Sequence, residues 1–259
     1  FDIDGLRLDV AYLLDRNFLR ELRGFVKGLK PDFALMGETL HGDYNTWMND
    51  DACDSVTNYE CYKGLYSSFN SANMHEISYS LNRQFGSENW CLYTGKHLMS
   101  FLDNHDVSRI ATILTDKNQL KPIYGLLFGM PGVPCMYYGS EWGVEGNKSD
   151  GDASLRPNIE KPEWNELTDW IAKLAEARKS SKALQYGSYN NLCVQPKQLI
   201  FERSVDGERV IVAINADGNT YHADFNANAG RAVDIITQKE HDFGGGSDLP
   251  PYSCSFWRV

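Results

Sequence analysis

The chain has 259 residues, a formal net charge of −10 and a sequence pI of about 5.1. This acidic balance argues against nucleic acid and anionic membranes as partners, because both require a basic binding face. No apolar run approaches the length of a membrane span. From the charge and the lack of such a run, we expect neither a nucleic-acid partner nor a membrane partner.

Three apolar segments that end in carboxylates stand out in the first part of the chain. They are residues 1–9, 33–39 and 98–106, which carry Asp9, Glu38 and Asp106. The first is predicted to be a buried strand, and residues 16–29 after it place apolar side chains at helical spacing. Strand, acidic loop, helix and strand in this order form the unit of a parallel barrel, whose chemistry lies at the carboxyl ends of the strands. Taken singly, each acid would suit a helix cap, a turn or a surface ion pair.

The remaining elements follow in chain order. We expect strands at 52–59 and 133–138, helices within 74–85, 119–129 and 167–180, and a polar loop at 147–159. After residue 184 the pattern changes to short β runs. Residues 199–202 and 210–214 flank a turn near Asp206-Gly207, which indicates a hairpin in an antiparallel sheet. The predicted boundary lies near residue 182.

Four segments resemble the strand-end motifs of the α-amylase family of retaining α-glucoside hydrolases and transglycosylases, glycoside hydrolase family 13. They are GLRLD at residues 5–9, GE at 37–38, FLDNHD at 101–106 and PGVPCMYYGSE at 131–141. One such motif arises easily by chance, whereas four in the right order do not. The resemblance implies an α/β fold: about five strands from the C-terminal part of a (β/α)8 TIM barrel over residues 1–182, then a small antiparallel β-sandwich domain over 183–259.

The resemblance also implies that the Arg-x-Asp strand is the fourth of eight. We therefore expect the chain to be a fragment whose missing N-terminal barrel half acts as a partner. Without it, the isolated chain is expected to be a poor enzyme, since an open parallel sheet lacks one wall of the site. No metal ligand or cofactor is assigned to these residues, although the family implies calcium in the full-length protein.

Residue roles are carried over by match to the family motifs. Asp9 is the expected nucleophile, Glu38 the general acid and then base, and Asp106 the carboxylate that binds hydroxyls of the reacting sugar. Arg7, two residues before Asp9 and thus on the same strand face, would orient it. Further substrate contacts are expected from His105, Asn104, His41, Asp152 and Arg156, although the last two also suit an ordinary surface pair.

The expected function is retaining hydrolysis of α-glucosidic bonds in starch, maltodextrin or related glucans by double displacement, with an α-linked glucose oligosaccharide or polysaccharide as partner. An α-glucan transglycosylase shares every residue named, and a non-catalytic glucan-binding relative or an inactive fragment is the alternative from another class. The six cysteines show no CxxC or metal-ligand spacing. Their even number could mean disulfides, but several lie in apolar strand-like runs where a free thiol behaves as a small hydrophobe, which favours reduced thiols and a cytoplasmic location over secretion.

Overall fold

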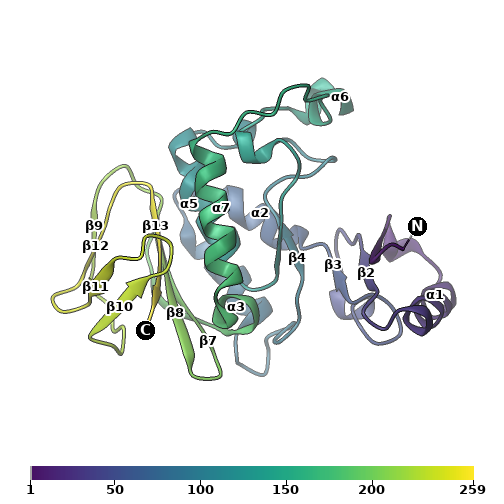
Figure 1. Ribbon diagram of the computed structural model, residues 1–259, viewed down its shortest axis with the longest axis horizontal. Helices are drawn as coiled ribbons and strands as arrows, with labels where there is room; N and C mark the ends of the chain where they lie inside the picture. The colour runs from purple at the N-terminus through teal and green to yellow at the C-terminus, as the bar shows by residue number, and fades with distance from the viewer. Residues whose placement is uncertain (1) are drawn as a thin grey trace.

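The structure is a computed structural model that describes residues 2–259. Phe1, which belongs to the predicted first strand, lies outside the described residues. The chain forms a parallel α/β part followed by an antiparallel β part, with the N-terminal strands and the C-terminal sheet at opposite ends of the molecule (Figure 1).

Five short parallel strands lie side by side in chain order. They are β1 (Gly5–Leu8), β2 (Ala34–Gly37), β3 (Ser55–Val56), β4 (Met99–Phe101) and β5 (Val133–Cys135). The first three form one sheet and the last two another, and a single parallel bridge between Thr57 and Met99 joins them. The predicted five-stranded portion of a barrel is therefore confirmed.

Helices connect these strands and cover the sheet. They are α1 (Arg16–Leu29), α2 (Tyr59–Asn70), α3 (Met74–Phe85), α4 (Ile110–Ile113), α5 (Leu120–Gly129), α6 (Asp152–Leu155), α7 (Glu166–Lys179) and α8 (Lys182–Tyr186). Among residues 2–259, no helix is both long enough and apolar enough to cross a membrane. Short 3-10 turns include η1 (Ala11–Leu13) after β1 and η4 (Ser140–Trp142) after β5.

Three expectations about local structure were wrong. Strand β1 is only half-buried, because within the described residues it pairs with β2 alone and its other edge is open. The strand expected at 52–59 is reduced to two residues, and an unpredicted helix, α2, begins at Tyr59 after Thr57 and Asn58. The loop expected at 147–159 contains the short helix α6, in which Asp152 is the first residue.

The C-terminal part contains two antiparallel sheets. Six strands are ordered β11-β10-β13-β8-β7-β6, and β12 pairs with β9. Their bounds are β6 (Ser188–Val194), β7 (Gln198–Val205), β8 (Glu208–Asn215), β9 (Tyr221–Ala223), β10 (Arg231–Asp234), β11 (Glu240–Asp242), β12 (Ser247–Leu249) and β13 (Ser253–Arg258). The predicted hairpin is β7–β8, whose turn residues Asp206 and Gly207 have φ of 50° and 81°, as a two-residue hairpin turn requires.

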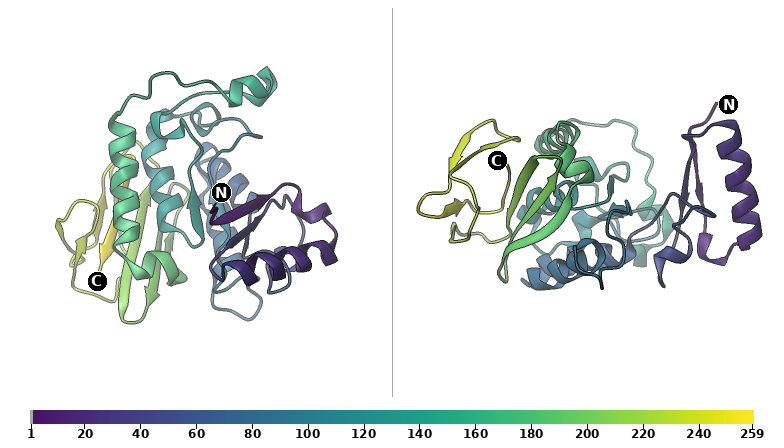
Figure 2. Two further views of the ribbon diagram at one scale, coloured as in Figure 1. Left: turned by 45° about the vertical axis from the view of Figure 1, so that its right-hand side comes forward. Right: turned by 90° about the horizontal axis from the view of Figure 1, so that it is seen from below.

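One hydrophobic core joins the two parts. Leu65 of α2 and Leu126 of α5 belong to the same buried cluster as Phe201 of β7 and Val212 of β8. Figure 2 shows α5 lying against the C-terminal sheet with α7 beside α5, while the β1–β3 segment projects away from the sheet.

Two buried arginines bind the C-terminal end of α5, Arg178 from α7 and Arg203 from β7. Arg178 donates to the carbonyls of Phe128 and Met130, and Arg203 donates to the carbonyl of Gly129. Burial lowers the pKa of Arg178 to about 10 and that of Arg203 to about 9. Cationic donors at helix carbonyls offset part of this cost, because the C-terminal end of a helix carries partial negative charge.

The close approach of α5 to β13 gives a testable packing prediction. A Cβ atom on Gly125 would overlap the Cys254 sulfur, so Gly125→Ala should destabilise the fold by about 1–3 kcal/mol through overpacking. Gly24 in α1 has no neighbouring heavy atom within 4 Å of the same position, so Gly24→Ala should stabilise the helix by about 0.5–1 kcal/mol. Urea denaturation measures both free energies of unfolding. Equal stabilisation by the two changes would contradict this packing.

Candidate active site

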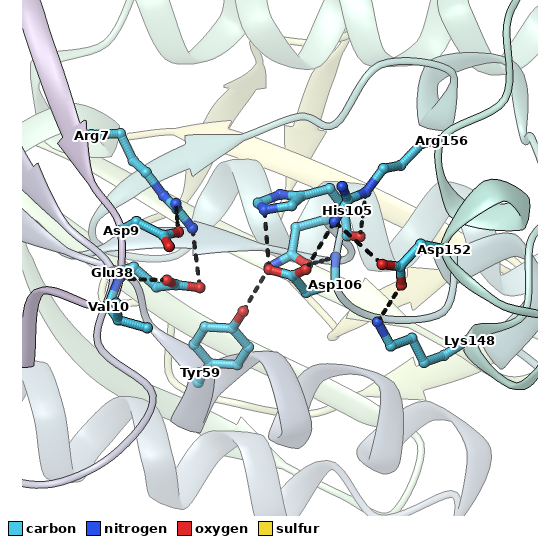
Figure 3. A network of polar contacts seen from close by, with 11 residues as sticks. Arg7, Asp9, Val10, Glu38, Tyr59, His105, Asp106, Lys148, Asp152 and Arg156 are labelled. Carbon is cyan, nitrogen blue, oxygen red and sulfur yellow. Dashed lines mark hydrogen bonds and ion pairs between the residues drawn. The ribbon is translucent and has the colours of Figure 1, made fainter. Parts of the chain in front are cut away.

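The first part of the site is built on the carboxyl ends of β1 and β2. These strands pair in parallel with Leu8 opposite Gly37, so the residues that follow them, Asp9 and Glu38, emerge at the same edge. Arg7 reaches both: one terminal nitrogen of its guanidinium bonds the Asp9 carboxylate, and the other lies 3.0 Å from Glu38 Oε1. The Arg7 side chain thus forms ion pairs with both carboxylates (Figure 3).

The two carboxylates have different environments. Glu38 is 5% exposed, and its second oxygen accepts a 2.9 Å hydrogen bond from the backbone N–H of Val10. The Asp9 side chain is 75% exposed. Val10 lies in the left-handed region, with φ of 39°, which is unfavourable for a β-branched residue. Such strain costs roughly 1–3 kcal/mol and here aims the Val10 N–H at Glu38.

The second part of the site follows β4. The His105 Nε2 atom lies 3.0 Å from Asp106 Oδ2, and Arg156 places one guanidinium nitrogen 3.3 Å from Asp106 Oδ1. Arg156 Nε also donates to the carbonyl of His105. Asp152 accepts a 2.7 Å bond from Lys148 and lies 4.0 Å from Arg156, so it joins the edge of this network.

Tyr59 lies between the two parts (Figure 3). Its hydroxyl accepts a 2.9 Å bond from Asn104 Nδ2, and Asn104 Oδ1 in turn accepts from the backbone N–H of Asp106. Burial raises the pKa of Tyr59, the Asn104 bond lowers it, and the charges of Glu38 and Asp106 raise it further. Carboxylates from both parts of the site therefore raise the pKa of the Tyr59 hydroxyl.

Of the nine residues singled out from the sequence, eight belong to these two networks. His41 does not: it is exposed, and its ring packs 5.3 Å from the ring of Tyr12. No bond from His41 to Glu38 or Asp9 occurs within the described residues. His41 lies on the loop that follows β2, and Tyr12 lies in η1 after β1.

Sequence reasoning missed three contributors. Tyr59 is the last residue of the strand expected at 52–59, so a polar side chain at a predicted strand end is the signal that could have found it; in the structure it is the first residue of α2. Lys148 precedes Asp152 by four residues, a spacing that favours ion pairs on a helix. The N–H of Val10 carries no sequence signal, since any residue but proline supplies one.

Residues 2–259 contain no group of three or more His, Cys, Asp or Glu side chains arranged to hold a metal ion. No step proposed below involves the calcium that the resemblance implies for a full-length relative. All six cysteines are unpaired.

Comparison with known proteins agrees with the geometry. Residues 2–183 match the family model described as "Alpha amylase, catalytic domain". Curated relatives include a cyclomaltodextrinase of Geobacillus thermopakistaniensis (strain MAS1), 29% identical over 83% of this chain and 37% of that protein. Neopullulanase 2 of Thermoactinomyces vulgaris is 32% identical over 83% of the chain and 37% of its own length. A maltogenic α-amylase of Bacillus acidopullulyticus is 28% identical over 96% and 44%.

Solved structures show the same likeness. An Anoxybacillus α-amylase superposes on 99% of the chain with a TM-score of 0.85 and 26% identity, and 59% of that enzyme is covered. A cyclomaltodextrin glucanotransferase gives a TM-score of 0.86 and 25% identity over 99% of this chain and 56% of its own. The chain thus spans about two fifths of these curated relatives and under three fifths of these solved ones.

Proposed function

The chain belongs to the α-amylase catalytic-domain family, glycoside hydrolase family 13, and from that premise we propose that the protein containing it is a retaining hydrolase of α-glucosidic bonds. One observation carries the proposal: the Arg7 guanidinium contacts the carboxylates of both Asp9 and Glu38. Retaining glycosidases require two carboxyl groups about 5–5.5 Å apart, one on each side of the scissile bond.

In the first step, Asp9 attacks the anomeric carbon and forms a glycosyl-enzyme ester. The bond from that carbon to the glycosidic oxygen breaks, and Glu38 donates its proton to the departing oxygen. In the second step, Glu38 takes a proton from water, whose oxygen attacks the same carbon and releases Asp9 as a carboxylate. Arg7 orients Asp9 through a charge-assisted hydrogen bond, and the Val10 N–H orients Glu38.

The residues after β4 would bind the sugar that reacts. Asp106 and His105 offer an acceptor and a ring nitrogen to its hydroxyls, and these contacts would tighten as the ring flattens in the transition state. Arg156 and Asn104 hold the Asp106 side chain and backbone. Asp152 would contact the next sugar, and His41 would line the side of the leaving group.

The substrate class we propose is a neutral α-linked glucan, such as starch or maltodextrin. The names of the relatives support it, since they include a cyclomaltodextrinase and a maltogenic α-amylase. An α-glucan transglycosylase is the second candidate, favoured by the structural likeness to a glucanotransferase. In that reaction a sugar hydroxyl replaces water in the second step, so the lengths of the products distinguish the two.

Retention predicts the configuration of the first product. The full-length protein should release the α anomer from maltooligosaccharides, because two inversions at one carbon restore its configuration. Proton NMR recorded in the first minutes, before mutarotation, resolves the two anomers. Initial release of the β anomer would indicate a single displacement and would remove Asp9 from the role of nucleophile.

A further inference from the structure

Two buried charged residues flank the segment that carries Asp106. Asp103 and Arg109 are 3% and 0% exposed, and the residues between them form neither helix nor strand. We propose that Asp103, Arg109 and the hydroxyl of Ser140 act together as positioning residues, here called the Ser140 bracket, that hold Asp106 in its reactive position. The inference rests on the proposed function.

Ser140 joins the two ends of this segment. Its hydroxyl donates to Asp103 Oδ1 at 2.7 Å and accepts from Arg109 Nη1 at 3.1 Å. Asp103 Oδ2 also accepts a 2.8 Å bond from the backbone N–H of Ile110. Ser140 comes from η4 after β5, so a neighbouring barrel element closes the Asp106 loop at its base.

Arg109 ties two further segments to the same point. It donates to the carbonyl of Tyr138 at 2.7 Å and to that of Leu155 at 2.8 Å, and its guanidinium carbon lies 4.1 Å from the Tyr137 ring centre. Leu155 immediately precedes Arg156, which bonds Asp106. One buried cation therefore fixes both the loop that carries Asp106 and the segment that carries its partner.

The charges argue for positioning rather than simple packing. Two buried opposite charges that meet through a hydroxyl are a weak source of stability, because desolvation offsets much of their attraction, and apolar side chains would fill the same space. Burial raises the pKa of Asp103, while the bonds from Ile110 and Ser140 and the charge of Arg109 lower it. What the bracket supplies is a directional connection, which matters because misplacing a catalytic group by about 1 Å can cost roughly 100-fold in rate.

The test is Ser140→Ala in the full-length protein, which removes the hydroxyl and little volume. We expect kcat for maltooligosaccharides to fall about 10- to 100-fold, while KM and the Kd of maltoheptaose change less than about twofold. This split is expected because the Asp106 contact strengthens only in the transition state. Ser140→Cys, which keeps the size and a weak donor, should lose less.

The matched control is Ser68→Ala. Ser68 is also fully buried, and its hydroxyl accepts a 3.0 Å bond from the N–H of Ile77, at the far end of α2 from Tyr59. It should lower the melting temperature without changing kcat. The bracket is overturned if Ser140→Ala keeps the wild-type kcat; should that variant not fold, the same criterion applies to Ser140→Cys. It is also overturned if kcat falls only in proportion to the loss of stability in both the Ser140 and the Ser68 variants. Absence of hydrolysis by the wild type would instead refute the proposed function.

Discussion

Replacing Asp9 with asparagine in the full-length protein is expected to lower kcat for maltooligosaccharides by roughly 10⁴-fold or more. The amide has the size of the carboxylate but cannot form the glycosyl-enzyme ester. Binding should survive, since most substrate contacts come from other residues, and the Kd of maltoheptaose should remain within a few-fold of the wild-type value. Reducing-sugar release measures turnover, and isothermal titration calorimetry measures binding.

Asp4→Asn provides the matched control. Asp4 lies just before β1, its side chain is 88% exposed, and it pairs with Lys30 at the surface. An exposed ion pair of this kind contributes little to stability, so turnover should be unchanged. Near-normal turnover by Asp9→Asn beside this control would exclude Asp9 as the nucleophile.

Glu38→Gln is expected to lower kcat for maltooligosaccharides by about 10²- to 10⁴-fold, because the leaving oxygen is no longer protonated. α-Maltosyl fluoride needs no proton on its leaving group. The variant should therefore release a burst of about one fluoride per enzyme, followed by slow turnover that sodium azide accelerates. A fluoride electrode follows both phases.

Comparison of the two variants separates the roles of the carboxylates. Asp9→Asn should show no fluoride burst, since it lacks the nucleophile, whereas Glu145→Gln, at an exposed acid paired with Lys117, should behave as wild type. If Glu38→Gln cleaves the fluoride as poorly as the oligosaccharide, Glu38 is not the general acid.

The strand ends and their acids could be predicted because their signals are local. An apolar run followed by a carboxylate marks Asp9 and Glu38 as strand-end acids, and the two-residue repeat of a strand places Arg7 on the same face as Asp9. The catalytic roles expected of the two acids are implied by the family resemblance. Parallel neighbours then bring the two strand ends together without further information. The hairpin at Asp206-Gly207 is local in the same sense, since its turn accommodates positive φ.

Boundaries were less predictable where packing overrides local preference. Helix α2 contains glycine, serine and aromatic residues, which are weak helix formers, and it is stabilised by burial of Cys61, Leu65 and Phe69 along one face. Its first residue, Tyr59, is the side chain between the two parts of the site. Strand β3, which precedes this helix, has only two residues, and so short a run does not let a sequence pattern locate the boundary between strand and helix.

The sequence by itself determined the fold class and the order of the strands, because short-range periodicity encodes them, while the roles expected for Asp9, Glu38 and Asp106 came from the resemblance of their motifs to the α-amylase family. The tertiary structure alone decided how these residues are held. Arg156 meets Asp106 across 50 positions in the chain, and Ser140 closes the loop between Asp103 and Arg109 from the next strand. Such bonds depend on how separate strand–helix units pack, since the partners share no periodic relation along the chain.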